Sequence, residues 1–170
     1  MNDSAMAYLA KIDLDGNIIW DLEFGQHNNS WTYVRHISEN DDGTIILVGE
    51  SDVSTGGGTN DVFIKKLSAT GMVIWEKEYG GIYDDLGGLA RPHPGGGYLV
   101  GGVWNRNGAG AIDDDIFLLK LDENGDQEWL QLYGTDFDDG GGVFTINSDT
   151  THVIWPSAFS VKHVPRRVFG

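Results

Sequence analysis

The sequence predicts an all-β protein built from repeated four-stranded antiparallel sheets, and three observations support this prediction. A segment of 54 or 55 residues recurs, and its tryptophan stands at Trp20, Trp75 and Trp129. Each repeat contains short apolar runs separated by glycine-rich turns, which is typical of strands. No segment of the sequence has apolar residues at helical spacing over a length that would favour a helix over strands.

The repeat also keeps other residues at the spacing of its tryptophan. A turn glycine recurs at Gly16, Gly71 and Gly125, and an aromatic position recurs at Phe24, Tyr79 and Tyr133. A unit that cannot bury its apolar face alone must pack on its neighbours. We therefore expect the repeated tryptophans and glycines to have structural roles at the contacts between neighbouring units.

The four strands of a unit are clearest between Asp84 and Gly134. We expect them at residues 86–92, 97–103, 115–121 and 126–134. The corresponding segments of the other repeats are 44–50, 61–67, 72–80 and 140–146. A four-stranded unit of about 50 residues is typical of a β-propeller blade. The small residues of "LGGLA" (86–90) suit the innermost strand, where sheets converge.

If each blade begins with its innermost strand, the chain divides into a repeat domain and a tail. The β-propeller repeat domain covers residues 1–158, with blade-forming repeats at about 6–30, 31–80, 84–134 and 138–158. The tail, residues 159–170, matches the repeat poorly and is basic. The two terminal repeats each supply half a blade, so the chain holds about three. Closed propellers need about 4–8 blades. The chain is thus expected to be a partial propeller, either half of a homodimer or part of a longer chain.

The repeat resembles a bacterial β-propeller repeat family, the SBBP type. The resemblance rests on the pattern D-x-F-x-x-K-L-x-x-x-G-x-x-x-W-x-x-x-Y-G followed by D-D, over roughly residues 6–155. The segment "KLDENGDQEW" (120–129) also resembles the tryptophan-docking motif of quinoprotein-type (PQQ-like) propellers. The resemblance implies the fold and an exported or cell-surface location in bacteria, although no signal peptide is visible. It implies no general catalytic set.

Composition limits the classes of partner. The formal net charge of −15 argues against nucleic acid, which selects for clustered Lys and Arg. No apolar run approaches the length of a membrane span, so membrane insertion is not expected. The chain has no cysteine, and its five histidines show no metal-ligand spacing.

Two aspartate pairs are candidate ligand-binding residues. Asp84 and Asp85 occupy the same repeat position as Asp138 and Asp139, and we align this position with Asn29 and Ser30 of the first repeat. A catalytic pair is needed once, so repetition favours a structural role such as capping backbone amides. Cation binding is the alternative, because hard cations prefer carboxylates. We therefore expect no cofactor, with calcium as the one alternative, and the metal content is otherwise unknown. The turns "DLDGN" (13–17) and "DENGD" (122–126) lack the spacing of an EF-hand loop.

The long loops 51–60 and 104–113 differ from one another and are rich in glycine. Function tends to be located in such loops on a rigid scaffold. The second loop offers side chains that stack on, or hydrogen-bond, a sugar or a peptide. These ligand-binding candidates are Trp104, Asn105, Arg106 and Asn107.

These observations favour a non-enzymatic β-propeller binding or scaffold module that presents its rim loops to a protein or glycan partner. One alternative is a fragment of a propeller enzyme, either a quinoprotein-like oxidoreductase or a glycoside-active protein. The inner strands offer too few polar residues to name a mechanism, namely Arg35, His36, Arg91 and Thr145. The other alternative is a truncated piece of a longer repeat array with no separate function.

Overall fold

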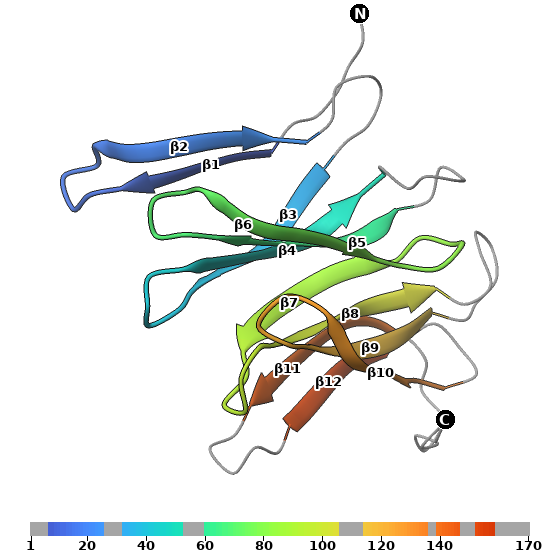
Figure 1. Cartoon of the computed structure of the whole chain (residues 1–170). Helices are drawn as coiled ribbons and strands as arrows, with labels where there is room; N and C mark the ends of the chain where they lie inside the picture. The colour runs from blue at the N-terminus through green and yellow to red at the C-terminus, as the bar shows by residue number, and fades with distance from the viewer. Residues whose placement is uncertain are drawn as a thin grey trace, which may run out of the picture.

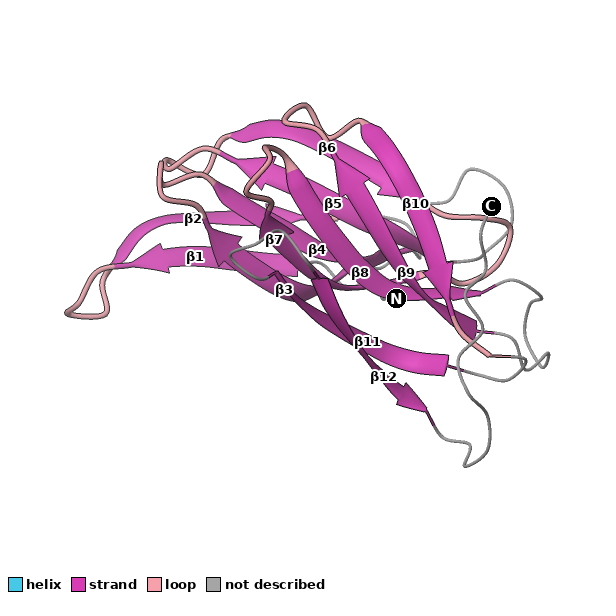
Figure 2. Ribbon diagram, turned by 90° about the horizontal axis from the view of Figure 1, so that it is seen from below, coloured by secondary structure: helices cyan, strands magenta, loops and turns pink. Residues whose placement is uncertain are grey.

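The computed structural model describes residues 7–25, 32–52, 60–105, 114–135, 139–146 and 152–158. Within these residues the secondary structure consists of β-strands joined by turns, and there is no helix (Figures 1 and 2). The strands form two four-stranded sheets and two two-stranded hairpins, and all pairs are antiparallel. The predicted all-β class with four-stranded antiparallel sheets is confirmed.

Each four-stranded sheet is made from consecutive strands. The first sheet has the order β3 (Thr32–Glu39), β4 (Ile45–Ser51), β5 (Asp61–Leu67) and β6 (Val73–Tyr79). The second sheet contains β7 (Leu86–Pro92), β8 (Tyr98–Asn105), β9 (Asp114–Leu121) and β10 (Gln127–Tyr133), again in sequence order. The hairpins are β1 (Ala7–Ile12) with β2 (Ile18–Phe24), and β11 (Asp139–Ile146) with β12 (His152–Ala158). The strands lie close to the predicted segments, and β5 and β7 coincide with them.

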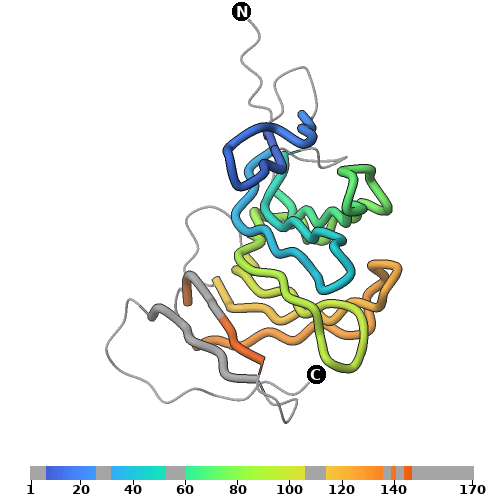
Figure 3. Tube along the Cα trace, turned by 90° about the vertical axis from the view of Figure 1, so that its left-hand side faces the viewer, coloured from blue at the N-terminus to red at the C-terminus, as the bar shows by residue number. Residues whose placement is uncertain are grey.

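The four layers stack face to face in chain order. The β1–β2 hairpin lies at one end of the stack and the β11–β12 hairpin at the other, so the sheets do not close into a ring (Figures 1 and 3). We call the contact between the β1–β2 hairpin and the first sheet the first boundary. The contact between the two four-stranded sheets is the second boundary.

The same turn joins the two outer strands of the first three layers. In the turn 13–17 the Asp13 amide donates to the Asn17 carbonyl at 2.9 Å, and Gly16 has a φ of 86°. The Asp13 carboxylate accepts hydrogen bonds from the amides of Asp15 and Asn17. Glycine is favoured here because a residue with a Cβ is strained at positive φ. The turns 68–72 and 122–126 repeat this backbone geometry, so the aspartate–glycine segments act as hairpin turns.

The inner strand β7 packs closely on the first sheet. A Cβ placed on Gly87 would lie 2.6 Å from the Gly49 carbonyl oxygen and 2.7 Å from the Val48 Cγ2 atom. Such distances are too short for any side chain, so the approach of the two sheets requires glycine at this position. This contact explains the small residues predicted for the innermost strand.

The largest apolar cluster lies at the second boundary. Its fully buried members come from both sheets: Ile46, Val48, Val62, Ile64, Ala90, Val100, Phe117 and Leu121. A smaller cluster at the first boundary contains Phe24, Leu47 and Phe63, and a third joins Leu99 and Leu118 to Phe144 of β11. Every layer therefore buries apolar area against the next, which is the dominant favourable term in folding.

Candidate functional site

The repeated tryptophans connect neighbouring layers. The indole Nε1 of Trp20 donates a hydrogen bond to the Ala69 carbonyl oxygen of the next layer at 3.0 Å. Trp75 makes the equivalent bond to Glu123 at 3.1 Å. In both cases the ring covers a turn glycine, because a Cβ on Gly71 or Gly125 would lie 2.9 or 3.0 Å from it. The tryptophans and glycines at these two contacts therefore act structurally.

The second boundary adds two polar contacts beside Trp75. The Tyr79 hydroxyl donates to the Gly125 carbonyl oxygen, and the Lys77 ammonium lies 2.8 Å from the Asp126 carboxylate. Burial, with the nearby charges of Asp126 and Asp122, raises the pKa of Tyr79 to about 12. The hydroxyl is thus held in its neutral, donating form at neutral pH.

Asp84 and Asp85 join the two sheets through backbone groups. Asp85 is fully buried, and its two carboxylate oxygens accept the amides of Gly81 at 2.6 Å and Asn105 at 2.9 Å. The Asp84 carboxylate accepts the Asn60 amide at 2.8 Å. Burial raises the pKa of Asp85 to about 6 against the opposing effect of the two amide bonds. Both side chains are therefore engaged in holding the ends of strands.

The second aspartate pair shows the same contact where it is described. Asp139 is buried, and its carboxylate accepts the Thr135 amide, as Asp85 accepts that of Gly81. Asp138 lies outside the described residues. In the described part of the chain no group of three or more acidic or histidine side chains has metal-binding geometry. Calcium binding remains a sequence prediction.

The strand register corrects one alignment of the repeats. Tyr33 pairs with Glu50 as Leu86 pairs with Val103, so Thr32, the first residue of β3, aligns with Asp85, which directly precedes β7. The sequence alignment had placed Ser30 there. It failed because the chain between consecutive layers differs in length, which the spacing of the tryptophans does not reveal.

The four candidates of the loop 104–113 divide into described and undescribed residues. Trp104 is half-buried, and its ring packs edge-on against Phe117 with ring centroids 5.8 Å apart. Asn105 ends β8, and its backbone amide binds Asp85. Arg106 and Asn107 lie outside the described residues. Trp104 and Asn105 thus make contacts within the fold, and the ligand-binding role of the four residues stays a prediction.

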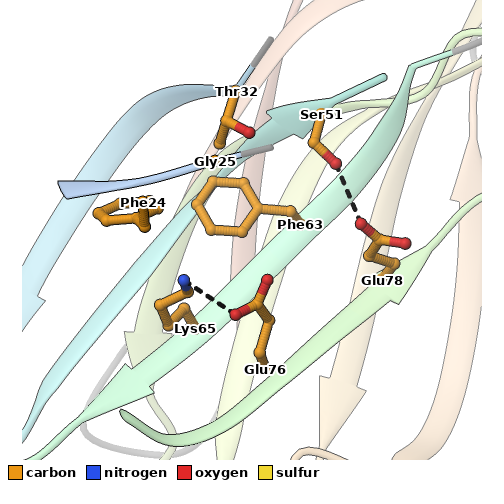
Figure 4. Close-up of a pocket in the computed structure, with 8 residues that line it drawn as sticks. All are labelled: Phe24, Gly25, Thr32, Ser51, Phe63, Lys65, Glu76 and Glu78. Atoms are coloured by element: carbon orange, nitrogen blue, oxygen red, sulfur yellow. Dashed lines mark hydrogen bonds and ion pairs between the residues drawn. The ribbon is translucent and has the colours of Figure 1, made fainter. Parts of the chain in front are cut away.

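A polar pocket opens at the first boundary. It has a volume of about 220 Å³ and lies between the end of β2 and the first sheet (Figure 4). The Lys65 ammonium is 2.8 Å from the Glu76 carboxylate and 4.1 Å from the centre of the Phe24 ring. On the other side of the pocket the Ser51 hydroxyl donates to the Glu78 carboxylate at 3.1 Å. Thr32, Gly25 and Phe63 complete its lining.

Comparison with the second boundary shows which lining residues are special. Cross-strand pairing places Phe117 where the first sheet has Phe63, so this ring is kept. Four other equivalent positions change from polar to apolar, namely Lys65 to Leu119, Glu76 to Leu130, Glu78 to Leu132 and Ser51 to Trp104. A surface that is apolar at one boundary is therefore rebuilt with charged and hydroxyl groups at the other.

Sequence reasoning missed this pocket. The clue was present, because "FIKKL" and "WEKEY" carry charges where "FLLKL" and "WLQLY" carry leucines. Charges on strands are usually solvent-exposed, and Glu76 is indeed exposed. Only the structure shows that Lys65 is 4% exposed, which makes this charge a feature of the interior.

Among the inner-strand polar residues, Arg35 is engaged by an ion pair. Its guanidinium Nε donates to the Glu50 carboxylate at 2.8 Å, and Glu50 is only 2% exposed. A buried carboxylate with a cationic partner is a common structural arrangement. Arg35 therefore has a role that requires no substrate.

Comparison with known proteins gives no family assignment. No family model matches the chain, and no curated protein matches it. The part of the chain that the structure describes contains no helix with the length and apolarity to cross a bilayer.

Proposed function

We propose that the layers are β-propeller blades and that the chain is a non-enzymatic binding module. The blade interpretation is supported by the strand order and by the close approach of the sheets at Gly87. It is also supported by the two contacts in which Trp20 and Trp75 dock on the turn of the next layer. The same interpretation assigns Asp84, Asp85 and Asp139 to the scaffold. The binding role then belongs to a place where the repeat departs from its own packing.

The pocket at the first boundary is that place, and its composition is the observation that supports binding. Two carboxylates and two hydroxyls can accept hydrogen bonds, a lysine can donate them, and two phenylalanine rings form part of the wall. Hydroxyl-rich ligands with one apolar face, such as sugars, match this mixture. Ligand pockets for drug-sized molecules span about 300–1,000 Å³. A pocket of about 220 Å³ suits one terminal sugar residue of a glycan.

The position of the pocket connects it with the predicted rim loops. Ser51 lines the pocket and also ends β4, where the loop 51–60 begins. A glycan whose terminal residue enters the pocket would contact Ser51, where this loop begins. The glycan is therefore the partner class we favour over a protein surface.

Saturation-transfer NMR with glucose, galactose, mannose and N-acetylglucosamine tests the proposal on the full chain. We expect at least one sugar to bind, and Glu78→Gln to weaken its binding by tenfold or more, about 1.4 kcal/mol. The matched control is Glu128→Gln, because Glu128 is an exposed carboxylate of the second sheet that does not line the pocket. No binding, or equal losses in both variants, would overturn the proposal. Turnover of the sugar would favour the enzyme alternative.

A further inference from the structure

Trp20 and Trp75 each dock on the turn of the next layer. For the third tryptophan, Trp129, the matching free turn lies at the opposite end of the stack. Trp129 of β10 occupies the position of Trp20 and Trp75, but no carbonyl among the described residues accepts a hydrogen bond from its indole. At the other end, the turn 13–17 has the same geometry as the two occupied turns. A Cβ on its Gly16 would meet nothing within 4 Å, and Leu14 is fully exposed.

The residues beside these two half-sites are also complementary. Tyr133 occupies the position of Tyr79, whose hydroxyl binds the glycine carbonyl of the docked turn. Gln131 and Asn17 occupy the positions of the ion pair Lys77–Asp126 and offer two amides in its place. The groups that hold the turn 122–126 at the second boundary therefore all have counterparts. Those on the tryptophan side lie in β10, and those on the turn side lie near the N-terminal end of the described chain.

The first sheet shows a second unpartnered feature at its inner strand. By register, Val34 and Ile37 of β3 match Gly87 and Ala90 of β7. Ala90 is fully buried against the preceding layer, whereas Val34 is 38% and Ile37 is 46% exposed. Among the described strands, the outer pair β1 and β2 alone precedes β3 in the stack (Figure 1). An inner pair of strands is what would cover these side chains.

The β11–β12 hairpin supplies such an inner pair. Leu89 pairs with Gly101 as Val143 pairs with Trp155, so β11 and β12 correspond to β7 and β8. The lysines Lys11 and Lys120 place β1 in correspondence with β9. In the described residues β12 and β1 each have one edge without a strand partner. The order β11–β12–β1–β2 would reproduce the order of both complete sheets.

We propose that two copies of this chain associate head to tail through this composite sheet. Trp129 of one copy docks on the turn 13–17 of the other, donating to the Leu14 carbonyl, and β12 pairs with β1. Two complete sheets from each copy and one composite sheet at each of two junctions give six sheets. Six lies within the range of about 4–8 that closed propellers use. A second copy is the occupant because both complementary halves are encoded in this one sequence.

The proposed interface and the proposed function both assume that the layers are propeller blades. The interface does not require the pocket to bind a sugar. It places β12 of the second copy beside the first boundary, so the pocket would lie next to the junction. A protein that dimerises without binding sugar would contradict the pocket and leave the interface standing. A monomer that binds sugar would do the opposite.

Sedimentation equilibrium of the full chain at physiological salt is the first test. We expect a mass of twice 18.6 kDa. Because tryptophans at interface centres are typical hot spots, Trp129→Ala should raise the dimer Kd by about 30-fold or more. Gly16→Ala should weaken the dimer similarly, since its Cβ would meet the docked ring. The matched control is Gly96→Ala, because Gly96 has a φ of 89°, close to the 86° of Gly16, and no docked ring, so this variant should leave the Kd unchanged.

Two further variants keep the test valid if Trp129→Ala unfolds the third apolar cluster. Ile37→Glu changes an exposed residue of the monomer and should abolish the dimer, whereas Ile82→Glu, at an exposed site outside the junction, should not. The chain has no cysteine, so a 1:1 mixture of Asn17→Cys and Gln131→Cys chains can be crosslinked cleanly. We expect a crosslinked pair from the mixture and none from either variant alone. A monomer at all concentrations, a continuous ladder of sizes, or a dimer insensitive to these changes would overturn the closed two-copy ring.

Discussion

The two boundaries of the first sheet are made by the same repeat and differ in what they bury. At the second boundary, Trp75 packs beside Tyr98 over an apolar cluster that joins two complete sheets. At the first boundary, Trp20 docks in the same way, but the sheet faces a two-stranded hairpin across a polar pocket. The docking contact is therefore the constant part of the repeat. The side chains of the two outer strands differ between the boundaries, because Lys65, Glu76 and Glu78 at the first correspond to leucines at the second.

Truncation of the docking tryptophans should break the comparison most strongly. Trp75→Ala should lower the free energy of unfolding by about 3 kcal/mol, the low end for a tryptophan because the side chain is half-buried. Trp20→Ala should instead release the hairpin locally, since few contacts hold β1 and β2 on the first sheet. Urea denaturation gives the global effect, and amide hydrogen exchange at Leu9 and Leu22 reports the hairpin. Equal global losses in the two variants would show that both boundaries carry the same stability.

The pH dependence of stability should arise from the second boundary. The folded-state pKa of Asp85 is about 6, above its value of about 3.9 in an unfolded chain. The folded state therefore holds this proton more tightly. The stabilisation is complete below about pH 4 and is lost as pH rises through about 6, a change of up to about 3 kcal/mol. The corresponding Thr32 at the first boundary does not titrate.

Asp85→Asn isolates this contribution. Urea denaturation between pH 4 and pH 7 should show a fall in stability for the wild-type chain that is smaller by this amount in the variant. The carboxyl carbon of Asp85 should titrate near pH 6 by NMR. A pH profile that is parallel in both proteins would remove Asp85 as the cause.

Much of this architecture was predictable, and the reasons differ between fold and site. The turn at Gly71 and the inner strand at Gly87 follow from local chemistry, because positive φ and close approach select glycine. The partner of Trp75 did not follow, since its acceptor is a backbone carbonyl at Glu123, which any residue type provides. The pocket did not follow either. Whether Lys65 faces solvent or the next layer depends on packing between layers, which alternation along one strand cannot specify.

Substitution of the turn glycines should distinguish a turn that is covered by a tryptophan from a turn that is not. Gly125→Ala should combine the cost of a non-glycine residue at positive φ, about 1–2 kcal/mol, with overpacking against Trp75 of about 1–3 kcal/mol. Gly16→Ala should show only the first cost at concentrations where the chain is monomeric, because its Cβ would enter open space. Chemical denaturation of both variants measures the difference. Equal costs would mean that the Trp75 ring yields to the added methyl group.

The smallest effects should come from the buried lysines, and they test why the pocket is polar. Lys65 has Glu76 as its ion-pair partner, whereas Lys120 also donates to the carbonyls of Gly96 and Leu121. Glu76→Gln leaves the buried Lys65 ammonium without its counter-charge, but Glu76 itself is half exposed, so the cost should be about 1 kcal/mol rather than the roughly 3–5 kcal/mol of a fully buried pair. Glu128→Gln should cost less than about 0.5 kcal/mol, since the Lys120 ammonium keeps both carbonyl acceptors.

Replacing both members of the first pair should reverse the sign. The double variant Lys65→Leu with Glu76→Leu installs the leucines that the second boundary carries at these positions. Replacing a buried ion pair by packed apolar residues is often neutral or stabilising by about 1–4 kcal/mol. We expect about 1 kcal/mol of added stability by urea denaturation, together with loss of sugar binding by NMR. If the double variant were both less stable and still able to bind, the charges would be part of the fold, and the contrast between the two boundaries would carry no functional meaning.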